Sequence, residues 1–437
     1  MRNNQLLYLS LCCFIILFVG MGLFPVLPSY DAQFGATRTV VGIHFALMYA
    51  ANVAGHMLAG RLAARLTRQG AFVMAGMLGI PALILLGHAT ALWHVIALTA
   101  ITWFCGGVGF ALVGVFTGLH ADRDSRGRSF VVTYLAYPLG ATFGGATVGR
   151  LVAWQGYPVM FAVLGAVWAF LPLIGLLKLK DKQTSKPAAS TAQAGGASTP
   201  SSRTPALAHT PPSRASARAL HWLLTVMLMS ATAIGVGRLG MPLSMQALDF
   251  PAGAIASVTA MSGLVAVPVA LLIGALSDRL GRRRFLALIY VLVASGMLIL
   301  SAADQVWHFW LAATLMFVAL STNGALTSAL ATDILPQEAL GRSLPRITAT
   351  NSAAAVLSFA STGFVMDTFG ATALYVAAAG LALIAALQLR RVESHAQRVE
   401  ARVAYLGQYN KPTVQSAIPL NTQLPDAHQL RRMESSC

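Results

Sequence analysis

The chain has 437 residues, of which 56% are hydrophobic and 10% are charged, and it carries a formal net charge of +16. A soluble protein of this length exposes far more polar surface, so the composition indicates a polytopic membrane protein. The charge does not indicate a nucleic-acid partner, because all Lys and Arg other than Arg38, Arg150 and Arg238 fall on segments that we assign to the cytoplasm.

Six apolar runs in the first part of the chain are long enough to cross a bilayer as helices. The first run ends at Pro28 and is kept as a membrane helix, because no small-residue cleavage site closes it as a signal peptide. We predict these helices at about 6–28, 39–62, 71–88, 93–119, 129–154 and 157–177.

Residues 179–219 are rich in Ala, Ser, Thr, Pro and Gly and are predicted to form a flexible cytoplasmic linker. Six more apolar runs follow, and the tail at 392–437 is polar and basic. The predicted domains are therefore an N-terminal six-helix bundle at 1–178, the linker, a C-terminal six-helix bundle at 220–391 and the tail, with both termini in the cytoplasm. The second set of helices is predicted at about 220–247, 252–277, 285–302, 306–335, 343–366 and 371–390.

The two halves repeat each other at a single ungapped offset of 214 residues, the separation of Gly156 from Gly370. One offset that holds along most of both halves indicates duplication. The fold class that follows is an all-α membrane protein with 12 transmembrane helices in two pseudo-symmetric bundles. Further matching positions are Pro28 with Pro242, Trp93 with Trp307, and His94 with His308.

A dense charge cluster lies between the second and third helices of the C-terminal half. Its pattern, G-x-L-x-D-R-x-G-R-R, resembles the loop signature of the major facilitator superfamily. The resemblance implies a secondary transporter that works by alternating access on a small-molecule substrate, without a cofactor and with a proton gradient as a source of energy. The residues of this loop are Gly274, Asp278, Arg279, Gly281, Arg282 and Arg283, and the corresponding loop of the first half contains Gly60, Arg61 and Arg65.

The same resemblance implies a gate on the cytoplasmic side. Asp278 is expected to dock at the start of helix 5, beside Arg126 and Arg128, and the matching site in the other half lies at Arg342. Ala64 replaces the Asp of the first half, so an anionic lock is expected in one half only. In the alternative interpretation, Asp278 merely offsets neighbouring Arg residues on a solvated loop.

Two further stretches resemble the drug and proton antiporters of this superfamily. Helix 1 ends in a P-x-x-P pattern, and Gly140, Gly144 and Gly145 fit the pattern G-P-x-x-G-G with Ala141 at the Pro position. The resemblance favours export of a small organic or amphiphilic compound, such as a drug, siderophore or metabolite, in exchange for protons. Tight helix packing is the alternative explanation for the small residues. A proton-coupled importer and a non-transporting sensor are the alternative functions.

Few polar side chains fall inside the apolar runs, and an ionisable group at membrane depth is a functional candidate because it is costly. The repeat partner of Arg238 is Phe24, so the scaffold does not require a charge there. Trp103 occupies the position at which such antiporters carry an Arg linked to proton coupling, so if protons are used, another titratable group must carry them. The alternatives are packed histidines, helix-bridging asparagines and an Arg238 that reaches outward. The residues predicted to line the substrate cavity are Arg238, Asn52, His44, His56, Trp103 and Asn323.

No catalytic pattern is present: H-E-x-x-H, G-x-S-x-G and paired acids within the apolar runs are all missing, so we do not expect an enzyme. No metal site or disulfide is expected, because three of the four Cys lie in apolar runs and the last is the C-terminal residue. We predict a monomer in the plasma membrane, a bacterial inner membrane, that contacts lipid and a small-molecule substrate and binds no nucleic acid.

Overall fold

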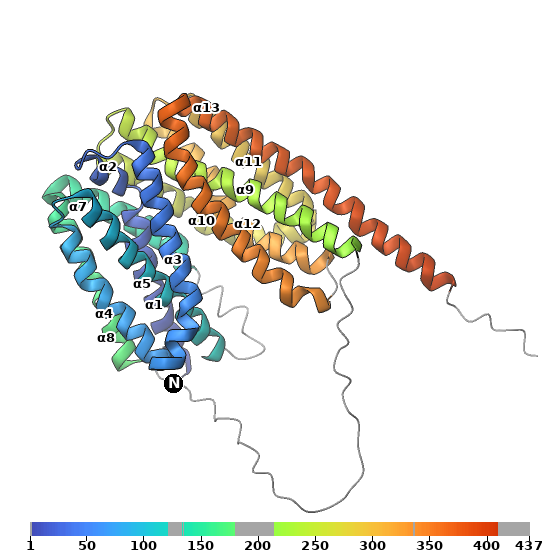
Figure 1. Cartoon of the computed structure of the whole chain (residues 1–437), viewed down its shortest axis with the longest axis horizontal. Helices are drawn as coiled ribbons and strands as arrows, with labels where there is room; N and C mark the ends of the chain where they lie inside the picture. The colour runs from blue at the N-terminus through green and yellow to red at the C-terminus, as the bar shows by residue number, and fades with distance from the viewer. Residues whose placement is uncertain (1, 121–132, 134, 180–213, 335–336, 410–437) are drawn as a thin grey trace, which may run out of the picture. The chain divides into compact units, whose positions relative to one another are not determined.

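The computed structural model describes residues 2–120, 133, 135–179, 214–334 and 337–409, and some side chains within these ranges, 270–280 among them, are outside the description. All regular elements in the described part are α-helices (Figure 1). The chain divides into a unit Met1–Glu393, which includes both predicted bundles, and a unit Ser394–Cys437. The helices are α1 (Arg2–Leu23), α2 (Leu27–Ala32), α3 (Arg38–Leu66), α4 (Arg68–Leu86), α5 (Leu92–His120), α7 (Ala136–Trp168), α8 (Phe170–Leu177), α9 (Arg214–Ala247), α10 (Ala252–Leu280), α11 (Arg282–Ser301), α12 (Val306–Ile334) and α13 (Gln337–Tyr409).

Nine helical segments of the described part are long and apolar enough to cross a membrane. Two of these segments, 42 and 44 residues long, turn at Gly156 and Gly370, so each contains two spans. α10, with 29 residues, completes the twelve. The predicted fold class of two six-helix bundles is therefore confirmed. The first predicted helix differs from the structure: it breaks after Leu23, and Pro28 instead stands in the first turn of α2, where a missing N–H costs little.

The backbone confirms the repeat. Positive φ angles favour Gly, because a Cβ crowds the backbone there. Thr67 nevertheless adopts φ 68°, and its hydroxyl accepts a hydrogen bond from the Gly70 N–H at 3.0 Å, which caps α4 and offsets part of the strain. All positive-φ residues in the described part form pairs at the repeat offset of 214: Gly35 with Asp249, Thr67 with Gly281, and Gly156 with Gly370.

The Trp-His pairs of the two halves also adopt matching conformations. His94 Nδ1 accepts from the backbone N–H of Thr90 at 3.3 Å, and His308 Nδ1 accepts from that of Asp304 at the same distance. In both pairs the Trp and His ring centres are 3.9 Å apart. The duplication thus preserves a helix start, where backbone N–H groups need acceptors, as well as the helices themselves.

Glycines of α7 set how closely its neighbours approach. A Cβ at Gly140 would lie 2.8 Å from Leu17 Cβ of α1, and one at Gly144 would overlap the Phe18 carbonyl oxygen. On another face of the helix, a Cβ at Gly145 would lie 2.8 Å from the Ala256 carbonyl oxygen of α10. The antiporter-like motif therefore packs α7 against α1 in its own half and against α10 in the other half.

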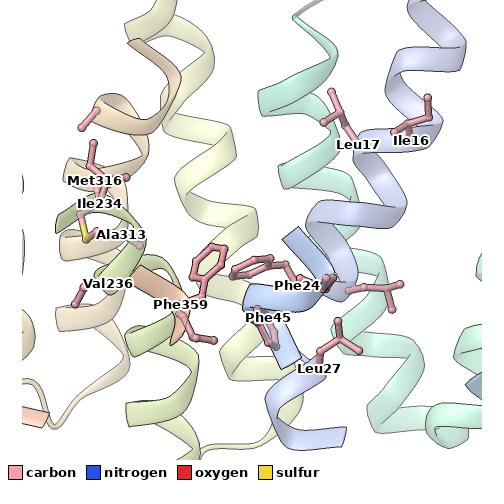
Figure 2. Close-up of a cluster of buried hydrophobic side chains, with 14 of the residues drawn as sticks. Ile16, Leu17, Phe24, Leu27, Phe45, Ile234, Val236, Ala313, Met316 and Phe359 are labelled. Atoms are coloured by element: carbon pink, nitrogen blue, oxygen red, sulfur yellow. The ribbon is translucent and has the colours of Figure 1, made fainter. Parts of the chain in front are cut away.

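A second contact between the halves joins α3 to α13. It lies at the end of the bundles that carries the turns at Gly35, Gly156, Asp249 and Gly370, which we call the Gly35 end. Figure 2 shows the Phe359 ring of α13 pointing toward Phe24 and Phe45, with ring centres 5.7 and 6.2 Å away. A Cβ at Gly42 of α3 would lie 2.7 Å from the Phe359 carbonyl oxygen, so only a residue without a side chain fits there.

Candidate transport site

Four of the six side chains predicted to line a substrate cavity do lie on one cavity. It has a volume of about 220 Å³ and is bounded by α1, α3, α5, α7 and α9. Arg238, Asn52, His56 and Trp103 are on its wall. Aromatic side chains form much of the remaining lining: Tyr49, Phe110, Tyr137 and Trp168.

Arg238 is held by apolar and aromatic partners. Its guanidinium carbon lies 4.1 Å from the centre of the Phe24 ring, and its Nη2 lies 3.7 Å from Met21 Sδ. None of the acidic side chains that the structure describes forms an ion pair with it. A cation over an aromatic face is stabilised by the ring but keeps its hydrogen-bond donors for another acceptor. Because Phe24 is its repeat partner, two symmetry-related positions stack on each other between the halves.

Arg238 and Met21 also border a second cavity of about 60 Å³. This cavity lies among α9, α10 and α12, and its lining is mostly apolar. Arg238 therefore stands where an aromatic and polar space meets an apolar one. An amphiphile could place its charged group at Arg238 and an apolar portion on either side.

Close packing of α3 and α5 positions Asn52 and His56. A Cβ at Gly107 of α5 would overlap the Asn52 carbonyl oxygen, so the two helices can meet here only because that residue is Gly. Asn52 Nδ2 donates to the Trp103 carbonyl oxygen at 3.0 Å, and His56 Nδ1 donates to the Asn52 carbonyl oxygen at 2.9 Å. With Nδ1 engaged, Nε2 is the ring nitrogen of the exposed His56 that can accept a hydrogen bond.

His44 is not part of this cavity, which corrects one expected placement. It is fully buried between α2, α3 and α5, with Nδ1 2.7 Å from Asp31 Oδ2 and Nε2 2.5 Å from Thr99 Oγ1. Its ring nitrogens are both occupied, so it drops out of the set that we propose to contact substrate. The sequence did not indicate Asp31, because an acid just beyond an apolar run is usually a surface residue.

Asn323 is also placed away from the cavity and ties helices together. Its Oδ1 accepts from the Tyr290 hydroxyl at 2.9 Å, and its Nδ2 donates to Ser230 Oγ at 3.3 Å. These bonds join α9, α11 and α12 within the C-terminal half. The helix-bridging alternative therefore describes Asn323, whose amide is satisfied inside its own bundle.

A polar contact closes the Gly35 end between the two halves. Asp367 Oδ2, on α13, accepts from the Thr39 backbone N–H at 2.8 Å and from the Thr39 hydroxyl at 2.6 Å. The carboxylate thus caps the first turn of α3, where an N–H has no partner within the helix. The repeat counterparts of these residues are Ala153 and Gly253, so the other half lacks these side-chain hydrogen bonds.

The predicted cytoplasmic gate cannot be followed to its contacts, since its main members lie outside the described residues. Of the loop itself, Gly281 separates α10 from α11 with a φ of 84°. Gly60, Arg61 and Arg65 lie in the last turns of α3. Outside the description are the surroundings of Gly274, the side chains of Asp278, Arg279 and Arg342, and all of Arg126 and Arg128.

A family model described as Major Facilitator Superfamily matches residues 9–243 and 223–404. A search of curated proteins found no match. Among solved structures, one similar chain is a POT family transporter in complex with a thioalcohol conjugated peptide, at 13% identity and a TM-score of 0.69, covering 90% of this chain and 96% of that one.

Two other solved structures share the fold. One is a bacterial homolog of the human lysosomal transporter Spinster, inward-facing and unoccupied, at 16% identity and a TM-score of 0.62, covering 90% of this chain and 96% of that one. The other is a mutant of the nucleoside transporter NupG, at 13% identity and a TM-score of 0.70, covering 89% of this chain and 100% of that one. From the family match across both halves, the chain belongs to the major facilitator superfamily.

Proposed function

We propose that this chain is a secondary transporter for small anionic amphiphiles and that Arg238 binds the negative group. The observation that carries the proposal is a half-buried guanidinium on a cavity wall with no described acid paired to it. Arg presents several donors in a fixed plane, which suits carboxylate, sulfate or phosphate groups. An anion that enters the cavity would accept hydrogen bonds from the guanidinium N–H groups, which Phe24 and Met21 leave available.

The residues that line the cavity favour a substrate whose remaining part, apart from the negative group, is apolar or aromatic. Tyr49, Trp103 and Tyr137 line the same cavity as Arg238 and offer it ring faces and edges, and Met21 offers a polarizable sulfur. His56 and Asn52 supply a polar side of the cavity. A site with one charge and many rings selects compounds by shape and charge more than by a dense set of hydrogen bonds.

We further propose alternating access, with the Gly35 end as the outer mouth. The positive-inside distribution of Lys and Arg supports that orientation. The contacts of α7 with α10 and of α3 with α13 support a state closed on that side. Export is the direction that we propose, on the antiporter-like motif; proton-coupled import is the alternative that the same cavity could serve.

Ligand stabilisation of the purified protein tests the binding site. Anionic aromatic compounds should raise its unfolding temperature more than neutral or cationic analogues of the same skeleton. Arg238→Ala should weaken this effect at least about tenfold, because a hydrogen bond to a charged group contributes roughly 1.5–3 kcal/mol, and Arg238→Lys should restore part of it. The matched control is Arg150→Ala, which removes an exposed Arg of α7.

Flux in proteoliposomes then tests transport and direction. A compound that stabilises the wild type should exchange across the membrane, and accumulation in inside-out vesicles would identify export. Stabilisation by anions that is unchanged in Arg238→Ala would contradict the role of Arg238. Absence of flux for every stabilising compound would instead favour a sensor over a transporter.

A further inference from the structure

A buried acid-base pair lies between α2, α3 and α5, apart from the substrate cavity. The side chains of Asp31 and His44 are both 0% exposed, and their facing atoms, Oδ2 and Nδ1, are 2.7 Å apart. Asp31 Oδ1 has no hydrogen-bond partner. Among the described residues, no cation other than His44 is paired with this carboxylate. A carboxylate buried in this way is costly unless a proton accompanies it.

The hydrogen bonds around Thr99 favour one count of protons on the pair. The Thr99 hydroxyl is 2.6 Å from the Val95 carbonyl oxygen, to which it can donate its one proton. Its oxygen then accepts from His44 Nε2, so Nε2 carries hydrogen. Nδ1 and Oδ2 must therefore share one further proton, whether as imidazolium with carboxylate or as imidazole with carboxylic acid. Either arrangement leaves the pair with no net charge.

Removal of that proton leaves a net charge of −1 and reverses the bond to Thr99. Nδ1–H would still donate to Asp31, but Nε2 would become an acceptor, and the Thr99 hydroxyl would have to turn from Val95 toward it. Burial raises the pKa of the Asp31 carboxyl, while the hydrogen bond from His44 lowers it again in part. Among the described residues, the phenols of Tyr30 and Tyr157 also lie near Asp31. Their rings are 4.7 Å apart, and the Tyr30 hydroxyl donates to the Leu86 carbonyl oxygen.

We propose that Asp31 and His44 form the proton-binding site that couples this transporter to a proton gradient. The pair takes up one proton in one conformation and releases it in the other, and it is sealed from solvent in the structure described here. This inference rests on the proposed function, since coupling requires a transport cycle.

The repeat shows that the fold does not need these polar groups. Their counterparts in the C-terminal half, at the offset of 214, are all apolar. Those three residues are buried and line the smaller cavity next to Arg238. The same scaffold position is thus filled by a buried ionisable pair in one half and by apolar packing in the other. The counterparts of Asp31, His44 and Thr99 are Met245, Val258 and Ala313.

The pair also joins elements that touch the opposite half. α2, which carries Asp31, contacts α9, and α3, which carries His44, begins at the Asp367 contact. The His44 ring lies 5.6 Å from that of its neighbour Phe45, which packs near Phe359 of α13. A change of charge between α2 and α3 would therefore act on segments that must separate when the Gly35 end opens.

Spin-label distances across the Gly35 end test the proposal. Trp93 and Trp307 are exposed repeat partners at that end and can carry the labels, as Trp93→Cys and Trp307→Cys, in a background without native cysteines. The open and closed populations should change with pH, because the pair binds one proton in one conformation and releases it in the other. Asp31→Asn and His44→Gln should abolish this pH response while both populations remain. Thr99→Val should keep the response but move its midpoint to lower pH, because the protonated ring loses an acceptor.

The matched control is Asp304→Asn. It removes the charge of an exposed acid whose Oδ1 lies 3.1 Å from Nδ1 of the partly exposed His308, so it should leave the pH response intact. A response that persists in Asp31→Asn and His44→Gln would overturn the proposal, as would a wild type whose two populations do not depend on pH. The transporter proposal survives both of those results. A single distance at every pH would count against alternating access itself, and with it against the coupling site.

Discussion

The Asp367–Thr39 contact should set how often the Gly35 end opens. In Asp367→Ala the end of α3 loses an acceptor for its backbone N–H and for the Thr39 hydroxyl, at 2.8 and 2.6 Å. Hydrogen bonds to charged groups contribute roughly 1.5–3 kcal/mol, but exposure and salt reduce this, so the pair should stabilise the closed state by about 1–2 kcal/mol. The open population should therefore rise about five- to thirtyfold in the variant.

The same spin-label pair across the Gly35 end measures this population. Thr39→Ala should give a smaller increase, because the backbone N–H keeps its bond, and the double variant should show a coupling energy of about 0.5–1 kcal/mol. Asp249→Asn, which removes the charge of another exposed acid at this end and keeps a residue that tolerates its positive φ, is the control and should change nothing. Unchanged populations in Asp367→Ala, or strictly additive effects in the double variant, would show that the carboxylate does not hold the mouth closed.

Two further predictions concern the opposite end and the orientation. Asp278→Asn should shift the population toward the inward-facing state and lower turnover, whereas Ala64→Asp should stabilise the outward-facing state. A spin-label distance distribution that is unchanged in Asp278→Asn would show that the loop does not act as a gate. Cys introduced at Ser190 should react with an impermeant reagent only after the inner face is exposed, while Cys at Asp249 should react from outside. External reaction at Ser190 would reverse every assignment of sides.

The sequence predicted the architecture because membrane spans are a local property. A helix that crosses a bilayer needs about 20 apolar residues, and each such run can be recognised without knowledge of its neighbours. The repeat added information on the backbone, since a turn that Gly281 adopts freely recurs at Thr67, which pays for it in strain. The repeat also singled out Arg238 as a charge that the scaffold does not require, because its partner in the first half is Phe24.

The polar contacts could not be predicted in the same way. Asp31 and His44 are 13 residues apart on different helices, and Thr39 and Asp367 are 328 apart, so neither helical periodicity nor local motifs relate them. Which polar side chains meet depends on how helices pack, and packing here depends on glycines whose role appears only in three dimensions. His44 was therefore recognised as unusual but assigned to the wrong surroundings.

The asymmetry of the repeat leads to a final test. Breaking one partner of a buried pair leaves an unpaired group and destabilises, whereas replacing the whole pair by apolar residues is often neutral or stabilising by about 1–4 kcal/mol. Asp31→Ala alone should therefore lower the unfolding temperature. The combined change Asp31→Met, His44→Val and Thr99→Ala copies the packing of the other half and should fold at least as stably as the wild type.

If the pair exists for coupling, this combined variant should lose the pH response of the Gly35 end while its ligand stabilisation through Arg238 remains. A structural role predicts the reverse, namely lower stability with the pH response intact. The two readouts come from the same purified sample, so poor folding cannot be mistaken for loss of coupling. The reason to expect the first result is physical. The repeat shows that apolar side chains can fill this position, so an ionisable pair that the packing does not need is best explained by the proton that it binds.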